Sequence, residues 1–213
     1  YVVDKRQEMH FIQVFRCARK AGIVDENTRL SFLGFGTMNG KDGKPFKTRE
    51  GGVMRLEHLI ADIDEEMFRK ITENHEVDEA EARETAKLVG LSAIKYGDLS
   101  NQASKDYVFD LDKFTSFEGN TGPYAQYTYA RTCALLEKAK DVDAMATVPK
   151  ITAHEENELL KVLSRFGEAV KEAVKEYEPS VVTRYIIEVC SSFNKFYHNC
   201  PIVSENDETI RNT

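Results

Sequence analysis

The chain of 213 residues contains no tryptophan, five prolines and four cysteines. It has no low-complexity tract, and no apolar run approaches the roughly 20 residues that a membrane-spanning helix needs. Residue 1 lies in the strand-like segment YVVD, without the basic stretch and apolar core of a secretory signal. The sequence therefore predicts a cytoplasmic protein with no membrane partner.

The four cysteines do not form a zinc-binding pattern. Cys17, Cys133, Cys190 and Cys200 include no C-x-x-C pair and have no histidine at the spacing of a zinc ligand. Cys17 and Cys133 fall within helical patterns, where a buried thiol is expected. Cys190 and Cys200 are candidates for neighbours in space, but a cytoplasmic setting favours free thiols. We expect no metal site and no structural disulfide.

Basic residues are outnumbered by acidic ones. The chain has 29 Lys and Arg against 36 Asp and Glu, which gives a formal net charge of −7. A protein that binds nucleic acid without specificity needs a basic surface that releases counterions. The balance argues against DNA as a partner. It does not exclude an RNA held by a few placed side chains and aromatic stacks.

The first half of the chain has the pattern of an α/β fold. A strand at residues 1–4 precedes a helix over about 6–21, and a second strand is predicted over 29–38. A loop rich in glycine and lysine follows, then two helices, the second over about 78–96. Strand, helix and strand in this order are typical of a parallel sheet covered by helices.

After Lys113 the pattern becomes all-α. Each predicted helix there has an apolar face that must pack on another helix. The helices are expected over about 122–139, 155–177 and 180–198. We therefore expect an α/β part over 1–112 and a helical part over 113–213. One strand–helix–strand unit cannot close a sheet, so further strands are expected upstream, and the final IRNT resembles the start of another helix.

The most informative loop is GKDGKPFKTREGG at residues 40–52. Lys44 and Lys47 lie three apart within it, between glycines. Lysine is a flexible point charge that suits a phosphate whose position changes during a reaction. Such a loop can stabilise developing negative charge. The alternative is a solvated connection between a strand and a helix, which composition alone favours.

Five segments of the chain, in order, resemble one family. KPFKT resembles the degenerate KMSKS signature of class I aminoacyl-tRNA synthetases, and GKDGKPFKTREGG resembles the arginyl-tRNA synthetases. YVVDKRQEMHF resembles their late nucleotide-fold strand and the helix after it. LSAIKYGDLS, DYVFDLDKFTSFEGNTGPYAQYTYAR and FYHNCPIVSENDETIRN resemble successive later segments. The resemblance covers essentially the whole chain.

This resemblance implies the rear part of a class I, Rossmann-like catalytic domain, followed by a truncated helical-bundle anticodon-binding domain. It implies ATP-dependent activation of arginine, with Mg²⁺, and transfer to tRNA(Arg). Lys44 and Lys47 match the catalytic lysines that bind the ATP phosphates, and Thr48 takes the hydroxyl position of the signature. Gln7 matches a residue of the arginine pocket, and His10 matches one on the ATP side.

The positions of Gln7 and His10 suit these roles. They lie three apart, just past the end of the first strand, at the edge where open α/β sheets bind ligands. The carbonyl oxygen of an amide can accept from a guanidinium. The alternatives are a glutamine that caps the helix and a histidine that packs against its neighbours.

Tyr127 and Arg131 are four apart and therefore share one helix face. A ring beside a guanidinium suits an unstacked base. The two match family positions that approach the anticodon, so they are candidate anticodon contacts. Without the resemblance, a solvated face is the simpler interpretation. Tyr124 and Tyr129 are expected to pack.

The HIGH motif of the family is not found in this sequence, so the chain alone is expected to be inactive, because catalysis by positioning needs both halves of a site. One alternative is a free-standing, non-catalytic tRNA-binding module. Another is a sibling synthetase such as the cysteinyl enzyme, which shares a related helical domain. The cysteine spacing and the PFKTR form argue against the sibling.

Overall fold

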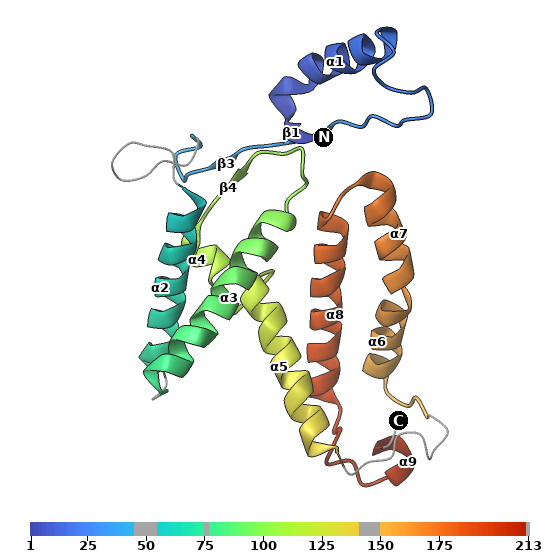
Figure 1. Ribbon diagram of the computed structural model, residues 1–213. Coiled ribbons are helices and arrows are strands. Elements are labelled where there is room, and N and C mark those ends of the chain that lie inside the picture. Colours follow the sequence, from blue (N-terminus) through green and yellow to red (C-terminus); the bar gives the residue numbers. More distant parts are fainter. Residues whose placement is uncertain (45–54, 75–76, 141–149, 212–213) are drawn as a thin grey trace.

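The computed structural model describes residues 1–44, 55–74, 77–140 and 150–211. The first strand and helix lie at one end of the molecule, and the remaining long helices extend from there side by side (Figure 1). The strands are short and lie between these two groups of helices. The predicted order, α/β and then all-α, is therefore present.

The N-terminal unit is built on two parallel strands. β1 (Val2–Asp4) pairs with β2 (Leu33–Phe35), with Val2 opposite Leu33. A 3-10 turn (Lys5–Gln7) follows β1 and leads into α1 (Glu8–Lys20). The carboxylate of Asp4 accepts a hydrogen bond from the backbone nitrogen of Arg6 at 2.9 Å, which caps this turn. The predicted strand and helix are confirmed.

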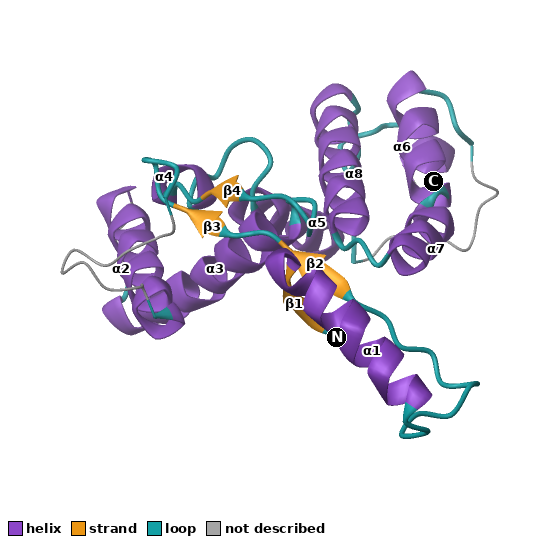
Figure 2. Ribbon diagram, turned by 90° about the horizontal axis from the view of Figure 1, so that it is seen from above, coloured by secondary structure: helices purple, strands orange, loops and turns teal. Residues whose placement is uncertain are grey.

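The second predicted strand, over 29–38, is only partly correct. The segment forms β2 and then β3 (Met38–Asn39), which pairs in parallel with β4 (Tyr107–Val108). Both strand pairs are visible from above in Figure 2. Gly36 separates β2 from β3, and a Cβ atom on it would lie 2.2 Å from the carbonyl oxygen of Lys105. The close approach of the two backbones at this point requires glycine.

Two long helices hold the main core. α2 (Leu56–Asn74) packs along α3 (Glu79–Leu99), and Asp78 caps α3 through its side chain. The buried apolar cluster between them comprises Leu59, Ile63, Met67, Ala86, Ala93 and Phe109. A short helix, α4 (Leu111–Phe114), closes one end of this cluster. The small alanines of α3 let α2 approach closely, and burial of the larger side chains of α2 then stabilises the pair.

The helical part follows. α5 (Gly122–Lys138) packs on α3, and α8 (Ser180–Asn199) packs on α5, α6 and α7. The other helices are α6 (His154–Ser164), α7 (Phe166–Glu176) and α9 (Glu208–Arg211). The single helix predicted over 155–177 is wrong, because it breaks at Arg165. Directly after the break, the ring of Phe166 contacts that of Tyr185 on α8, with centroids 5.9 Å apart.

The chain exposes an unusually large surface. Its 14,797 Å² exceeds the roughly 10,000 Å² expected of a compact protein of this length.

Cys17 and Cys133 are exposed, so the prediction that both are buried is wrong. Cys17 lies on α1, which stands apart from the other helices (Figure 1). In the described ranges, no helix is long and apolar enough to cross a membrane.

Candidate functional site

The end of β1 presents the first group of candidate residues. Gln7 and His10 are both exposed. Gln7 precedes α1, yet its side chain makes no capping hydrogen bond, so capping does not account for it. The ring of His10 meets that of Phe11 edge-on, with centroids 5.5 Å apart. Both side chains remain accessible to a ligand at this edge.

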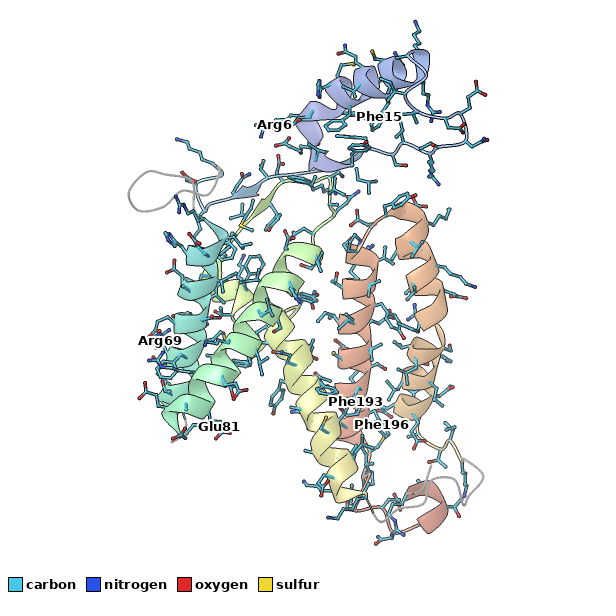
Figure 3. The ribbon with its side chains drawn as sticks, in the orientation of Figure 1. Arg6, Phe15, Arg69, Glu81, Phe193 and Phe196 are labelled. Atoms are coloured by element: carbon cyan, nitrogen blue, oxygen red, sulfur yellow. The ribbon has the colours of Figure 1, made fainter. Side chains whose placement is uncertain are left out.

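A charged pair that the sequence interpretation missed lies beside them. The carboxylate of Asp4 accepts from the guanidinium of Arg6, with Nε at 2.9 Å and Nη2 at 2.5 Å. This side-chain hydrogen bond from Arg6, more than any other contact, lowers the pKa of Asp4 to about 2. Arg6 lies on the surface next to β1 (Figure 3). The edge therefore carries a carboxylate whose charge is already matched by a local cation.

The lysine loop is described as far as Lys44. Its backbone closes a turn, in which the nitrogen of Gly40 donates to the carbonyl oxygen of Lys44 at 2.7 Å. The Lys44 side chain is exposed. Lys47 and Thr48 lie outside the described residues. Lys41, which the sequence interpretation did not single out, ties the loop to the segment before α4 through Asp110, with Nζ 3.2 Å from Oδ1.

The second group of candidates lies at the other end of the molecule, where α5 and α8 run side by side (Figure 1). Arg131 donates from Nη2 to the hydroxyl of Tyr127 at 3.0 Å. The Cζ atom of Arg131 lies 4.8 Å from the ring centroid of Tyr127 on α5 and 4.8 Å from that of Tyr197 on α8. The guanidinium is therefore flanked by two aromatic rings, an arrangement that attracts a cation to the ring faces.

A side-chain amide completes this group. Asn194 on α8 accepts from Nη1 of Arg131 at 2.5 Å. We call Tyr127, Arg131, Asn194 and Tyr197 the arginine cluster. Tyr127 and Tyr197 are 52% and 37% exposed as residues, whereas Arg131 and Asn194 are half-buried. The cluster thus presents aromatic surface to solvent while its polar groups bind one another.

The amide of Asn194 has two further contacts. Its Nδ2 atom donates to the hydroxyl oxygens of Tyr124 and Thr128, each at 3.0 Å. Figure 3 shows its neighbours Phe193 and Phe196 on the half of α8 that lies beside α5. Asn194 therefore joins α8 to three positions of α5 through one planar group.

The predicted shared face of Tyr127 and Arg131 is present, and their role at an anticodon remains a prediction. Tyr129 is 71% exposed, so the expectation that it packs is wrong. Asn194 and Tyr197 were missed. The available signal was their spacing of three within FNKFYH, which places an amide and a ring on one face of the predicted last helix.

The residues that the structure describes contain no preformed metal site. Within the described residues, no group of three or more His, Cys, Asp or Glu side chains is arranged to hold an ion. The four cysteines are free thiols, and burial raises the pKa of Cys190.

Two family models match the chain. The model of the catalytic domain of class I tRNA synthetases (R) matches residues 1–111, and that of the DALR anticodon binding domain matches residues 125–213. The fold and the matched ranges are thus those of a class I tRNA synthetase.

Comparison with known relatives shows to which family of class I tRNA synthetases the chain belongs. The chain is 54% identical to the arginine–tRNA ligase of Agathobacter rectalis over 99% of its own length, and 53% identical to that of Alkaliphilus oremlandii over 97%. It spans 37% and 36% of the lengths of these proteins. The chain belongs to the arginyl-tRNA synthetase family, and the predicted resemblance is confirmed.

Solved structures agree with this assignment. The arginyl-tRNA synthetase of Plasmodium falciparum superposes on the whole chain with a TM-score of 0.79 at 25% identity, and 36% of that protein is covered. The Thermus thermophilus arginyl-tRNA synthetase superposes on 99% of the chain with a TM-score of 0.80, covering 36% of that protein. At 24% identity, the second likeness concerns the fold alone.

Proposed function

We propose that the chain is part of an arginine–tRNA ligase, which activates arginine with ATP and Mg²⁺ and transfers it to tRNA(Arg). The observation that carries the proposal is the arginine cluster, because it presents aromatic rings on helices inside the range that matches an anticodon-binding model. A base that stacks on a protein ring gains about 1–3 kcal/mol. An acidic chain can therefore bind RNA at a few such positions.

The N-terminal residues take complementary roles in this proposal. Lys44 and Lys47 bind the ATP phosphates and stabilise the departing pyrophosphate, and Thr48 supports the same loop. His10 contacts ATP, and Gln7 accepts from the guanidinium of the substrate arginine. The exposure of Gln7, His10 and Lys44 supports these assignments, because each side chain is accessible to a ligand.

Binding of a tRNA(Arg) transcript to the purified chain tests the RNA site. Tyr127→Ala should weaken binding about 5- to 150-fold, which corresponds to the loss of one stacked base. Arg131→Ala should also weaken it. Tyr129→Ala is the matched control, since Tyr129 lies two positions further along α5 and outside the arginine cluster. Unchanged affinity of Tyr127→Ala would remove the cluster from RNA binding.

The chain alone should not activate arginine, since it spans about a third of its relatives and positioning needs both halves of the site. An ATP–pyrophosphate exchange assay measures this directly. Exchange that depends on arginine and is catalysed by the purified chain would contradict the proposal that the site is partial.

We further propose a division near residue 112, into a catalytic part over 1–112 and an anticodon-binding part over 113–213. The ranges of the two family models support it, because they leave residues 112–124 between them. We also propose a cytoplasmic location, since the relatives are tRNA ligases.

A further inference from the structure

We infer that Asn194 is a positioning residue for the RNA site: it holds the guanidinium of Arg131, which in turn orients the ring of Tyr127 that receives a base. The inference rests on the proposed function and deepens it. It assigns base stacking to Tyr127 and an indirect role to Arg131. The hydrogen bonds that join the three side chains carry the argument.

The chemistry of its neighbours allows the amide of Asn194 only one orientation. A guanidinium has donors only, so the group that faces Arg131 must be the carbonyl oxygen Oδ1. The hydroxyl of Thr128 donates to the backbone oxygen of Tyr124 at 3.0 Å, so its oxygen is left to accept from the amide nitrogen. An asparagine satisfies both sides, whereas an aspartate has no donor for Thr128.

The guanidinium of Arg131 is already engaged. Two of its five donors bind Asn194 and Tyr127, and the rings of Tyr127 and Tyr197 flank it. A base cannot stack on this guanidinium without displacing a ring. Tyr127 is 52% exposed as a residue and is held through its hydroxyl, with Arg131 over its ring, so a base would stack on the part of this ring that is exposed to solvent.

Holding a ring before RNA arrives increases affinity, because the cost of ordering that side chain is already met in the free protein. Loss of the contacts that orient the ring of Tyr127 should weaken RNA binding about 2- to 12-fold. Two variants remove these contacts at different points. Asn194→Leu removes the acceptor for Arg131, and Tyr127→Phe keeps the ring but removes the hydroxyl that Arg131 binds.

The test measures the affinity of the chain for a tRNA(Arg) transcript. Asn194→Leu and Tyr127→Phe should each weaken binding about 2- to 12-fold. The double variant should be no weaker than the weaker single variant, because both act through Arg131. A general loss of packing would instead multiply the two effects.

Asn199→Leu is the matched control. Asn199 also lies on α8, and its amide binds another helix through Glu155 at 2.9 Å, outside the arginine cluster. It should leave affinity unchanged. If Asn194→Leu does not fold, Asn194→Ala replaces it, since alanine also removes the acceptor for Arg131 and places no larger apolar group between the two helices. It should show the same weakening and the same lack of additivity with Tyr127→Phe.

The outcomes separate the inference from the proposed function. If Tyr127→Ala weakens binding while the Asn194 variants do not, the positioning role is overturned and the RNA site stands. Effects of Asn194 and Tyr127→Phe variants that multiply overturn it in the same way. If Tyr127→Ala itself has no effect, the proposed RNA site fails and the positioning role fails with it.

Discussion

Asp64 offers a sharp test of the interface between α2 and α3. Among the side chains that the structure describes, its Oδ1 atom is a buried oxygen without a hydrogen-bond partner. A Cβ atom on Gly90 of α3 would lie 2.6 Å from it, so the carboxylate is pressed against the facing helix. Burial raises the pKa of Asp64, and the nearby charge of Lys87 offsets only part of this effect.

Asp64→Ala should therefore stabilise the chain at neutral pH. A buried acceptor without a partner costs about 1–3 kcal/mol, and alanine adds up to ~0.7 kcal/mol of helix propensity. Against this stands the packing lost with a half-buried side chain. We expect a net gain of about 1–2 kcal/mol, which raises the melting temperature by about 2–8 °C for a chain of this size. Circular dichroism during heating measures it.

Asp62→Ala is the matched control, because Asp62 is exposed on the same helix and gains only helix propensity. A raised pKa means that folded Asp64 binds a proton more readily than the unfolded chain does. The destabilisation of the folded chain by ionised Asp64 is therefore greatest above the pKa of the folded state, and it decreases as the pH falls through that value. The advantage of Asp64→Ala over Asp62→Ala should shrink between about pH 7 and pH 4. If Asp64→Ala and Asp62→Ala have the same melting temperature at pH 7, or if the difference between them does not change with pH, this reasoning is refuted.

Three further predictions concern the fold. Met67→Ala, in the fully buried core of α2, should lower the free energy of unfolding in urea by about 2–5 kcal/mol, whereas the exposed Leu56→Ala should not. Gly36→Ala should cost about 1–3 kcal/mol in the same assay, because the new Cβ meets the backbone of Lys105. The large exposed surface predicts a radius of gyration by small-angle scattering above the roughly 17 Å of a compact chain. A value near 17 Å would contradict the extended arrangement.

The long helices were largely predictable, since their apolar residues recur at helical spacing. The predicted end of the first helix, near residue 21, lies one residue from the end of α1. The break at Arg165 was not predictable in this way, because the apolar period continues through it. Phe166, directly after the break, contacts Tyr185 on another helix, and a contact of this kind cannot be read from the local sequence.

The strands were harder for a related reason. The strands that pair with β2 and β3 lie at opposite ends of the first half of the chain. β2 pairs with β1 at residues 2–4, and β3 pairs with β4 at residues 107–108. The apolar run over 29–38 indicates extended backbone but not which residues find a partner. The division at Gly36 depends on the approach of Lys105, 69 positions away.

The difference between local spacing and long-range packing also explains which part of the proposed RNA site could be predicted from the sequence. Tyr127 and Arg131 share a helix face by spacing alone, so their contact could be predicted. Asn194 lies 63 positions from Arg131, and only the packing of α8 on α5 brings the two together. A signal was nevertheless present in the spacing of three between Asn194 and Tyr197, which places an amide and a ring on one face of the predicted last helix. Once the packing of α8 on α5 half-buries this amide, it needs hydrogen-bond partners, and the structure identifies them as Arg131, Tyr124 and Thr128.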